Sequence, residues 1–515
     1  MISLLDPEER IEGRIGVHDR RSFELKLDYT IDAERPLNRY AVDAFIFVPR
    51  SLGIHKDTYD RHRFYADVQA YIRFKTPPST LATLADLGAA EAPLVHLRWL
   101  LAELRGGDAA GARRAVRQAL RLLGCQLRWA LRREMGALLD RLAGPDPAAC
   151  PPQADALVHT LGLFLDRFRA LIEPVGSAAV RETARLVDEF VGLSAERQLT
   201  RLVAAVDQSP LAGVLADVRG RAVARILAER ERRATHGFGE SETSVGTPDE
   251  RMVYRLGVLK KFVMSVLFLD LARDPGRRAA DVAAAGAAAL AMFFAVIAAA
   301  WAQSSYGLNT TPFVLIIVAS YVVKDRIKDW ARQFFAAKMA HWLPDHVVRI
   351  REPLSGETLG RCRETMRFVK VADLPAAVRA LRYRRTPDAL LAGKPEIVLH
   401  YRKVVQIDAQ THRRTHGPLR DLNDIIRVNI GSFLARADDT TRRTLVYDAE
   451  LDRAAPVDLP KVYHLNVVLQ MGSPDGAEAP TTDRVRVVLD RDGIIRLEEP
   501  TQLRPSPTNL EAPST

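Results

Sequence analysis

An uncharged stretch at residues 282–323 constrains the fold of this chain more than any other feature. It contains no Asp, Glu, Lys, Arg or His, whereas charged residues make up 27% of the whole sequence. At 1.5 Å per residue, a helix of this length measures about 63 Å, enough to cross a hydrocarbon core of about 30 Å twice. The turn formers Gly307, Asn309 and Pro312 interrupt its middle. The stretch therefore predicts a transmembrane hairpin of two helices.

Basic residues flank the stretch on both sides, and its connecting loop carries no charge. They are Lys260, Lys261, Arg273, Arg277 and Arg278 before it, and Lys324, Arg326, Lys328, Arg332 and Lys338 after it. Under the positive-inside rule, both termini are cytoplasmic and the loop is outside. We therefore expect a protein of the bacterial cytoplasmic (inner) membrane. The alternative is an alanine-rich helical hairpin buried in a soluble protein, which would not need basic flanks.

The two predicted spans differ in length. The first, residues 282–302, is long enough to cross, whereas the second, residues 308–323, is slightly short. Lys324 and Lys328 extend the second span if their long side chains reach up to the interface. Neither span contains an ionisable residue, so neither predicts a proton or ion pathway.

Small residues recur every fourth position in the first span, at Ala283, Ala287 and Ala291. Such a row lets two helices approach closely in a membrane. The simplest partner for the row is the second span of the same hairpin. A homo-oligomer that forms through Ala283, Ala287 and Ala291 is the alternative. Besides the lipid bilayer, we expect protein partners at the cytoplasmic face.

The 515 residues exceed what one hydrophobic core usually organises, so two or three folding units are expected. Residues 23–31 alternate apolar and polar side chains, and residues 40–49 form a more apolar run, so both predict strands. From about Tyr59 the apolar residues recur with helical spacing. We therefore predict an N-terminal cytosolic domain at residues 1–236, with a small sheet followed by a helical bundle.

The rest of the chain divides by composition. We predict a linker at residues 237–250, an interfacial amphipathic helix at 251–281, a cytosolic helix that extends the second span at 324–345, a strand-rich C-terminal domain at 346–500 and a disordered tail at 501–515. Within the C-terminal domain, residues 396–408, 462–471 and 483–500 predict strands, and residues 419–439 predict a helix. The fold class is therefore an α+β membrane protein.

The densest polar cluster of the C-terminal domain lies in that predicted helix. Asp421, Asp424 and Arg427 follow one another at intervals of three and would share one helix face, with Asn429 beside them. Ion pairing between helix neighbours explains this spacing. A pair of catalytic carboxylates is the alternative interpretation.

Other signals of chemistry are weak. His412 and His416 have the spacing of helical metal ligands, but Gly417 and Pro418 break the helix and no cysteine is near, so we predict no metal site. Nucleotide-binding, hydrolase, metalloprotease and kinase motifs are missing, and we predict no cofactor. The net charge of +10 comes mostly from arginine in a pattern typical of GC-rich genomes, without a nucleic-acid-binding motif.

Cellular context follows from the cysteines and the first residues. Cys125, Cys150 and Cys362 are far apart, which fits reduced, buried thiols in a reducing compartment. The opening MISLLDPEER lacks a basic region followed by an apolar run, so we expect no cleavable signal peptide.

Three segments resemble a known class of protein. They are YADVQAYIRFKTP at residues 65–77, VKDRIKDW at 323–330 and DIIRVNIGSFLARADD at 424–439. These segments are similar to parts of uncharacterised bacterial two-span inner-membrane proteins. The resemblance implies the two-span topology and brings no activity and no catalytic residue.

The function that these patterns favour is a membrane-anchored interaction, signalling or scaffold module without a recognisable catalytic site. The first alternative is a membrane-anchored enzyme with its site near Asp421–Asn429. A transporter or channel subunit is the other alternative, but two spans enclose no pore without oligomerisation, and the spans carry no polar stripe.

Overall fold

The computed structural model describes residues 15–498 except 33, 108–109, 145–148, 239–249, 275–276, 308–309, 343, 354, 384–395, 417–420, 450–451 and 475–479. The described chain forms two compact units. The helical unit consists of residues 73–268, and the β unit joins the residues before 73 to those after 268. Most of the predicted linker and the whole predicted tail lie outside the described residues.

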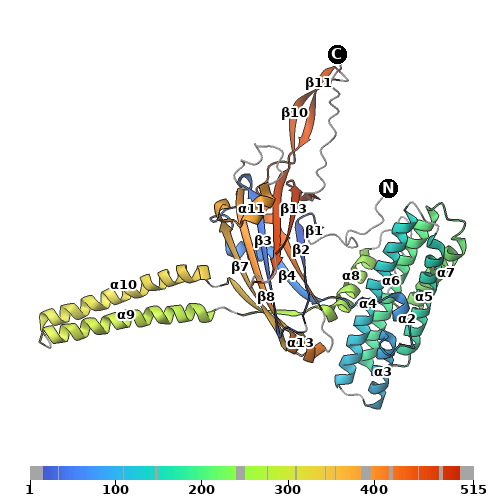
Figure 1. Ribbon diagram of the computed structural model, residues 1–515, viewed down its shortest axis with the longest axis horizontal. Coiled ribbons are helices and arrows are strands. Elements are labelled where there is room, and N and C mark those ends of the chain that lie inside the picture. The colour runs from blue at the N-terminus through green and yellow to red at the C-terminus, as the bar shows by residue number, and fades with distance from the viewer. Residues whose placement is uncertain are drawn as a thin grey trace. The chain divides into compact units, whose positions relative to one another are not determined.

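The helical unit is an antiparallel array of helices, as the apolar stripes predict (Figure 1). Its helices are α2 (Leu81–Ala85), α3 (Pro93–Gly106), α4 (Ala110–Leu142), α5 (Cys150–Ile172), α6 (Ala178–Asp207), α7 (Ala216–Thr235) and α8 (Glu250–Met264). The central helix is α6, which contacts α4, α5, α7 and α8. Its apolar side chains, such as Val187, Val191, Leu199 and Leu202, are buried.

Arginines of the helical unit pair with carboxylates inside it. Arg169 on α5 donates to Asp188 on α6 at 2.9 Å and to both oxygens of Glu229 on α7 at 2.8 and 2.6 Å. Arg232 on α7 donates to the other Asp188 oxygen at 2.8 Å. Both carboxylates are buried. These arginines therefore join three helices through charge-assisted hydrogen bonds.

The β unit contains two main sheets (Figure 1). The large sheet has the order β14-β13-β12-β3-β8-β7-β6-β5, and the small sheet the order β1-β2-β9-β4. The large-sheet strands are β3 (Leu37–Pro49), β5 (Asp270–Asp274), β6 (His346–Arg351), β7 (Thr358–Val369), β8 (Glu396–Asp408), β12 (Tyr463–Gly472), β13 (Thr481–Leu489) and β14 (Ile494–Glu498). The small-sheet strands are β1 (Ile15–Asp19), β2 (Ser22–Tyr29), β4 (Val68–Phe74) and β9 (Leu422–Asn429).

The strands predicted at residues 396–408, 462–471 and 483–500 are confirmed as β8, β12 and the β13–β14 pair. Asp492 and Gly493 lie in the turn between β13 and β14, and Gly493 has a φ of +149°, a conformation that favours glycine. Short helices complete the unit: α1 (Arg61–Asp67), α11 (Ala376–Tyr383), α13 (Ala409–His416) and α14 (Gly431–Leu434).

The N-terminal strands do not belong to a separate domain at residues 1–236. In the large sheet β3 lies between β8 and β12, and it pairs with β8 along its whole length, from Leu37 opposite Asp408 to Pro49 opposite Glu396. The last half of β3 is buried on both faces. Such a strand needs neighbours on both edges and cover on both faces, which a two-stranded N-terminal sheet cannot supply.

The helix predicted at residues 419–439 is wrong. The segment forms β9 and then the single turn of α14. In β9 the residues Leu422, Asp424, Ile426 and Val428 are buried, and those between them are partly exposed. A period of two therefore governs the segment, and the interval of three between Asp421, Asp424 and Arg427 is coincidental.

The interfacial helix predicted at residues 251–281 is only partly present. The helix α8 ends at Met264, and the strand β5 follows it before the next helix begins at Arg277. Leu259 and Val263 of α8 are buried, and α8 contacts α4 and α6. One apolar face of α8 therefore belongs to the helical bundle and does not lie on a lipid surface.

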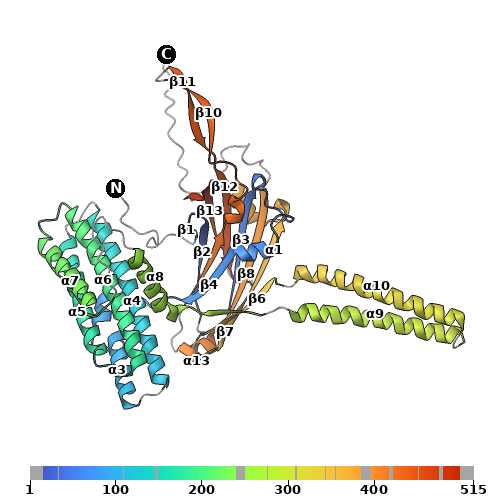
Figure 2. The ribbon, with the colours of Figure 1, turned by 180° about the vertical axis from the view of Figure 1, so that it is seen from behind.

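The uncharged stretch forms a helical hairpin of α9 (Arg277–Ser305) and α10 (Thr311–Trp342) (Figure 2). Ala287 and Ala291 are buried, and α9 packs against α10. This packing agrees with the simpler interpretation of the small-residue row, in which the second helix of the same hairpin is the partner. The side chain of Ala283 lies outside the description, and the homo-oligomer stays a prediction.

One helix, and not two, is long and apolar enough to cross a membrane among the described residues. This candidate is Ala284–Ser305 of α9. By contrast, α10 begins at Thr311 and reaches its first charged residue at Lys324, which leaves an apolar length of about 20 Å. The structure thus has one such helix where the sequence predicts two spans. The predicted continuation of the second helix beyond Lys324 is confirmed.

We expect that Gly192→Ala destabilises the helical unit. A Cβ at residue 192 would lie 2.7 Å from an oxygen of Glu229, the carboxylate that Arg169 holds. The resulting overpacking should lower the free energy of unfolding by about 1–3 kcal/mol. Urea unfolding of the detergent-solubilised chain, followed by circular dichroism, measures the change.

The matched control is Gly162→Ala on α5, where an added Cβ meets no atom within 4 Å. This variant should gain about 0.5–1 kcal/mol from the better helix propensity of alanine. Equal effects of the two substitutions would contradict the packing that we assign to Gly192.

Candidate functional site

A buried polar cluster joins the two sheets of the β unit. At its centre lie Lys403 on β8 and Asp424 on β9, both fully buried. The Lys403 Nζ atom is 2.9 Å from one Asp424 oxygen and 2.7 Å from the other. Since β8 belongs to the large sheet and β9 to the small one, this ion pair links the facing sides of the two sheets.

Two tyrosines and a second carboxylate complete the cluster. Tyr29 on β2 donates its hydroxyl proton to Asp424 at 3.0 Å, and Tyr401 on β8 donates to Glu364 on β7 at 3.1 Å. Glu364 also lies 3.7 Å from the Lys403 Nζ atom. Each buried charge therefore has an opposite charge or a hydroxyl donor beside it, which is the condition for burying charges at tolerable cost.

The alternation of each strand brings these residues together. On β8 the buried residues Tyr401, Lys403, Val405 and Ile407 occupy every second position and so share one face. On β7 the buried residues Cys362, Glu364 and Met366 do the same. Lys403 and Glu364 therefore lie between the sheets, because the other residues on the same face of their strands are buried there.

The electrostatics of the cluster keep its protons in place. Burial alone would lower the pKa of Lys403, but the Asp424 carboxylate, with Cys362 and Glu364, raises it above its ordinary value. Burial and then the Asp424 charge raise the pKa of Tyr29 well above its ordinary value. Burial and then the Glu364 charge do the same for Tyr401. At neutral pH the cluster thus contains a charged lysine and two neutral phenols.

A second set of contacts fastens α1 to the edge of the cluster. The Asp345 carboxylate accepts hydrogen bonds from the Tyr65 hydroxyl at 3.1 Å and from the Met366 backbone N–H at 2.6 Å. Its other oxygen accepts from Arg61 at 2.9 Å. Burial and then the Asp345 charge raise the pKa of Tyr65. The helix α1 is therefore held against β7 by one carboxylate.

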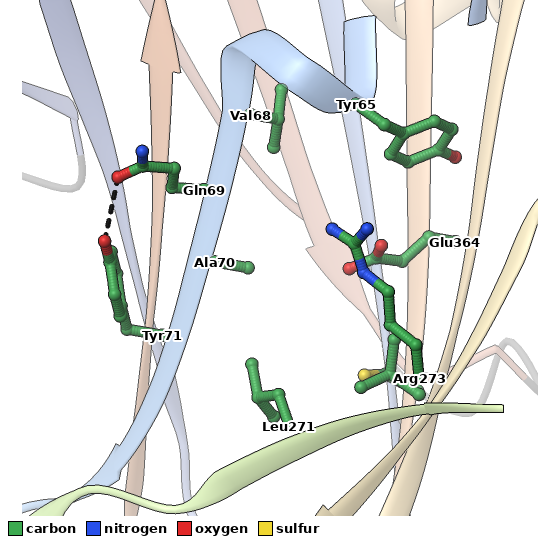
Figure 3. Close-up of a pocket in the computed structure, with 10 residues that line it drawn as sticks. Tyr65, Val68, Gln69, Ala70, Tyr71, Leu271, Arg273 and Glu364 are labelled. Carbon is green, nitrogen blue, oxygen red and sulfur yellow. Dashed lines mark hydrogen bonds between the residues drawn. The ribbon is translucent and has the colours of Figure 1, made fainter. Parts of the chain in front are cut away.

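A cavity of about 280 Å³ lies beside the cluster (Figure 3). Its walls come from α1 and β4 (Tyr65, Val68, Gln69, Ala70 and Tyr71), from β5 (Leu271 and Arg273) and from β6 and β7 (Val348, Cys362 and Glu364). Tyr71 donates a hydrogen bond to Gln69 at 2.8 Å. Glu364 belongs to both the cavity wall and the buried cluster.

The cavity wall holds a thiol, but not an activated one. Burial raises the pKa of Cys362 to about 12. The thiolate is the nucleophilic form of cysteine, so Cys362 stays an inert thiol at neutral pH. The arrangement can hold two sheets together and admit a small molecule beside Glu364, and it presents no activated nucleophile at Cys362.

The four residues of the alternative catalytic site do not come together. Only Asp424 enters the buried cluster. The side chain of Asp421 accepts from the Ile31 N–H at 3.2 Å, and that of Asn429 accepts from the Gly431 N–H at 2.7 Å. Arg427 donates to Glu24 at 2.7 Å. The structure therefore does not support the catalytic carboxylate pair proposed for Asp421 and Asp424.

The structure describes the side chain of only one of the two histidines that have the spacing of helical metal ligands. His412 is buried on α13, whereas the side chain of His416 lies outside the described residues. Within the described part of the chain, no three or more His, Cys, Asp or Glu residues are grouped so that they could hold a metal ion.

Lys403, Glu364 and Tyr29 are not among the site residues that the sequence predicts. A signal was present for Lys403: the segment Tyr401–Ile407 alternates, and the lysine stands in the row of Tyr401, Val405 and Ile407. A lysine in the apolar row of a strand indicates a buried charge that needs a carboxylate partner. The identity of that partner has no local signal, and the spacing of polar residues in the β9 segment predicts a helix instead of a strand.

Comparison of the chain with protein-family models, with curated proteins and with solved structures gave no match. The resemblance to two-span inner-membrane proteins stays a prediction.

We expect that Lys403→Met strongly destabilises the β unit. The substitution leaves Asp424 buried without its cation, which costs about 3–5 kcal/mol of unfolding free energy. The double variant Lys403→Met with Asp424→Leu should lose less, because it leaves no unpaired buried charge. Denaturant titrations of the wild type and of both variants measure these differences. A double variant that is less stable than Lys403→Met would contradict the pairing.

The pH dependence gives a separate check on this pair. A raised folded-state pKa means that the stabilisation from Lys403 is fully present below the unfolded-state pKa of about 10.4 and is lost as the pH rises through the folded value. On the alkaline side, the difference between wild type and Lys403→Met should therefore shrink above about pH 10.4. As a control, Lys461→Met, which removes the exposed partner of Asp438, should leave unfolding nearly unchanged.

Proposed function

We propose that the chain is an integral protein of a bacterial inner membrane, in which the α9–α10 hairpin anchors two cytoplasmic units that bind other proteins. The observation that carries the anchoring is the exposure of α9. Of the candidate span Ala284–Ser305, only 17% is buried. The core helix of a soluble protein would be mostly buried, so this surface is suited to lipid.

The outer surface of the hairpin supports the same proposal. Both helices expose large apolar side chains along their length. They are Leu290, Met292, Phe293, Val296, Ile297 and Trp301 on α9, and Val314, Leu315, Val318, Tyr321 and Val322 on α10. Water would make such a surface costly, whereas lipid chains cover it without cost.

Strand pairing supports an even number of crossings. The strand β5 directly precedes α9, and β6 directly follows α10. These two strands pair with each other, with Leu271 opposite Ile350. Both ends of the hairpin therefore belong to one sheet, and a sheet cannot continue across a bilayer. A single crossing by α9 alone is incompatible with this pairing, so we propose that α10 returns through the membrane.

The short apolar length of α10 is compatible with a return crossing if its basic residues reach the interface. The Lys324 Nζ atom lies 4.2 Å from the centre of the Tyr321 ring. A tyrosine beside a lysine is typical of the interfacial region, where both side chains place polar ends near the head groups. Local thinning of the bilayer takes up the remaining mismatch.

The binding role rests on exposed apolar side chains outside the hairpin. Val253 and Tyr254 on α8 are exposed, as is Trp99 on α3. In the β unit, Leu445 and Tyr447 are exposed. Exposed apolar groups that cluster mark sites of protein binding. Together with the fully paired cluster at Lys403, they favour an interaction or scaffold module over an enzyme.

Membrane fractionation tests the anchoring. The wild-type protein should stay in the membrane pellet after alkaline carbonate extraction. The double variant Phe293→Asp with Ile297→Asp should lose this resistance, because each buried aspartate costs about 2.5–3.5 kcal/mol on insertion. As a control, Trp99→Asp changes an exposed aromatic residue of the helical unit and should leave fractionation unchanged. Recovery of the wild-type protein in the soluble fraction would refute the proposal.

Reporter insertions test the topology. A reporter that is active only outside the cytoplasm should be silent after Thr515 and active when inserted at Gly307, because the basic flanks keep both ends of the hairpin inside. If both positions are silent while the protein resists carbonate, the hairpin enters one leaflet without crossing. That result would contradict the two proposed crossings, but it would still agree with the proposal that the hairpin anchors the protein in the membrane.

A further inference from the structure

The inference concerns a β arm made of β10 (Thr441–Asp448) and β11 (Arg453–Pro460). In the described part of the chain these strands pair only with each other. The arm exposes large apolar side chains: Leu445 is 74% and Tyr447 62% exposed, and Val457 and Leu459 are exposed as well. An isolated two-stranded hairpin with exposed apolar groups is marginal in water. The arm therefore lacks the neighbours that such strands normally have.

The two outer edges of the arm differ. Pro456 lies opposite Leu445, and Pro460 lies opposite Thr441. A proline has no N–H to donate, so these are positions whose backbone faces away from the partner strand. On β11 the outward positions 454, 456, 458 and 460 thus include two prolines, a device that blunts a sheet edge.

The edge of β10 has no such protection. By the same pairing, its outward positions are Thr441, Arg443, Leu445 and Tyr447. Each of these residues carries both an N–H and a C=O group. One edge of the arm is therefore closed to further strands, and the other is a complete template for one more strand.

We propose that β10 pairs antiparallel with β10 of a second copy of this chain, about a two-fold axis that passes beside Leu445. The two arms then form one four-stranded sheet with the proline-containing strands outside. Only registers that bring outward positions opposite each other make ladder hydrogen bonds. Among these, the register centred on Leu445 places Arg443 of each copy opposite Tyr447 of the other.

Self-complementarity is the reason to assign a second copy as the partner. In this register the exposed Leu445 side chains meet across the axis, and the guanidinium of Arg443 meets the ring of Tyr447 twice by symmetry. Cross-strand pairs of this kind, aliphatic with aliphatic and cation with aromatic ring, stabilise a ladder. A two-fold interface requires one patch to complement itself, and β10 meets that requirement.

The association should depend on concentration. One short strand edge buries less surface than the roughly 1,600 Å² of a standard stable interface. Copies confined to a membrane have a raised effective concentration, which favours a weak interface of this kind. The pairing itself does not rest on the membrane anchor, so its test stands apart from the fractionation experiment.

Disulfide trapping of the full-length protein tests the pairing. The three native cysteines are buried, so an introduced cysteine supplies the accessible thiol. Directly opposed residues of a hydrogen-bonded pair have Cα atoms about 5.5 Å apart, within disulfide range. Leu445→Cys should therefore give a covalent dimer under mild oxidation in membranes. The matched control is Leu459→Cys, an exposed residue on the closed strand, which should give none.

Proline substitution supplies a second test that keeps the arm intact. Arg443 and Asp458 lie opposite each other, and both backbones face outward. Arg443→Pro removes a donor from the open edge and should abolish the dimer trapped through Leu445→Cys. Asp458→Pro removes a donor from the closed edge and should leave the dimer unchanged.

Three results would overturn the proposal. They are the absence of a covalent dimer with Leu445→Cys, equal trapping at Leu459→Cys, and trapping that survives Arg443→Pro. Protection of the β10 amides from hydrogen exchange in a protein that stays monomeric would assign the edge to another occupant and would equally refute the two-fold pairing.

Discussion

The pairing of β5 with β6 is the constraint on which the arrangement of the β unit depends. These short strands bring the entry and the exit of the α9–α10 hairpin to neighbouring positions in one sheet. Because a backbone ladder needs strands about 4.8 Å apart, the hairpin must return to the side from which it started. The pairing thus links a local feature, five backbone residues of β5, to the topology of the whole chain.

Inside the β unit the two sheets are joined by charge as well as by apolar packing. The Lys403–Asp424 pair and the hydroxyl of Tyr29 connect strands that are distant in the sequence, since Tyr29 and Asp424 are 395 residues apart. Two sheets with a purely apolar interface could shift relative to each other at little cost. A buried ion pair opposes such a shift, because separating its partners would leave an unpaired buried charge. The cluster therefore suits the role of fixing the alignment of one sheet on the other.

Local patterns in the sequence were sufficient for much of this fold. The helical unit, the helical hairpin and the strands β8, β12, β13 and β14 follow from the spacing of apolar residues and from the turn formers at residues 307–312. The failures have a common physical cause. The place of β3 between β8 and β12, and the identity of β9, depend on pairing between segments hundreds of residues apart, for which spacing within a segment carries no information. The same cause applies to the buried cluster. The sequence singles out Asp424 as a candidate site residue, but its partner Lys403 follows only from the positions of β8 and β9 in the two sheets.

The residues of the β unit lie on both sides of the helical unit in the sequence, which has a consequence for biogenesis. The strand β3 leaves the ribosome long before β8 and β12, its neighbours on both edges. At about 5–20 residues per second, the 357 residues that separate Asp43 on β3 from His400 on β8 correspond to roughly 20–70 seconds of synthesis. During that interval the apolar strand has no ladder to join, while the helical unit and the α9–α10 hairpin are made in full. In the proposed topology the hairpin therefore reaches the bilayer before the sheet can close around its ends. The nascent strand must be shielded from aggregation until its partners emerge.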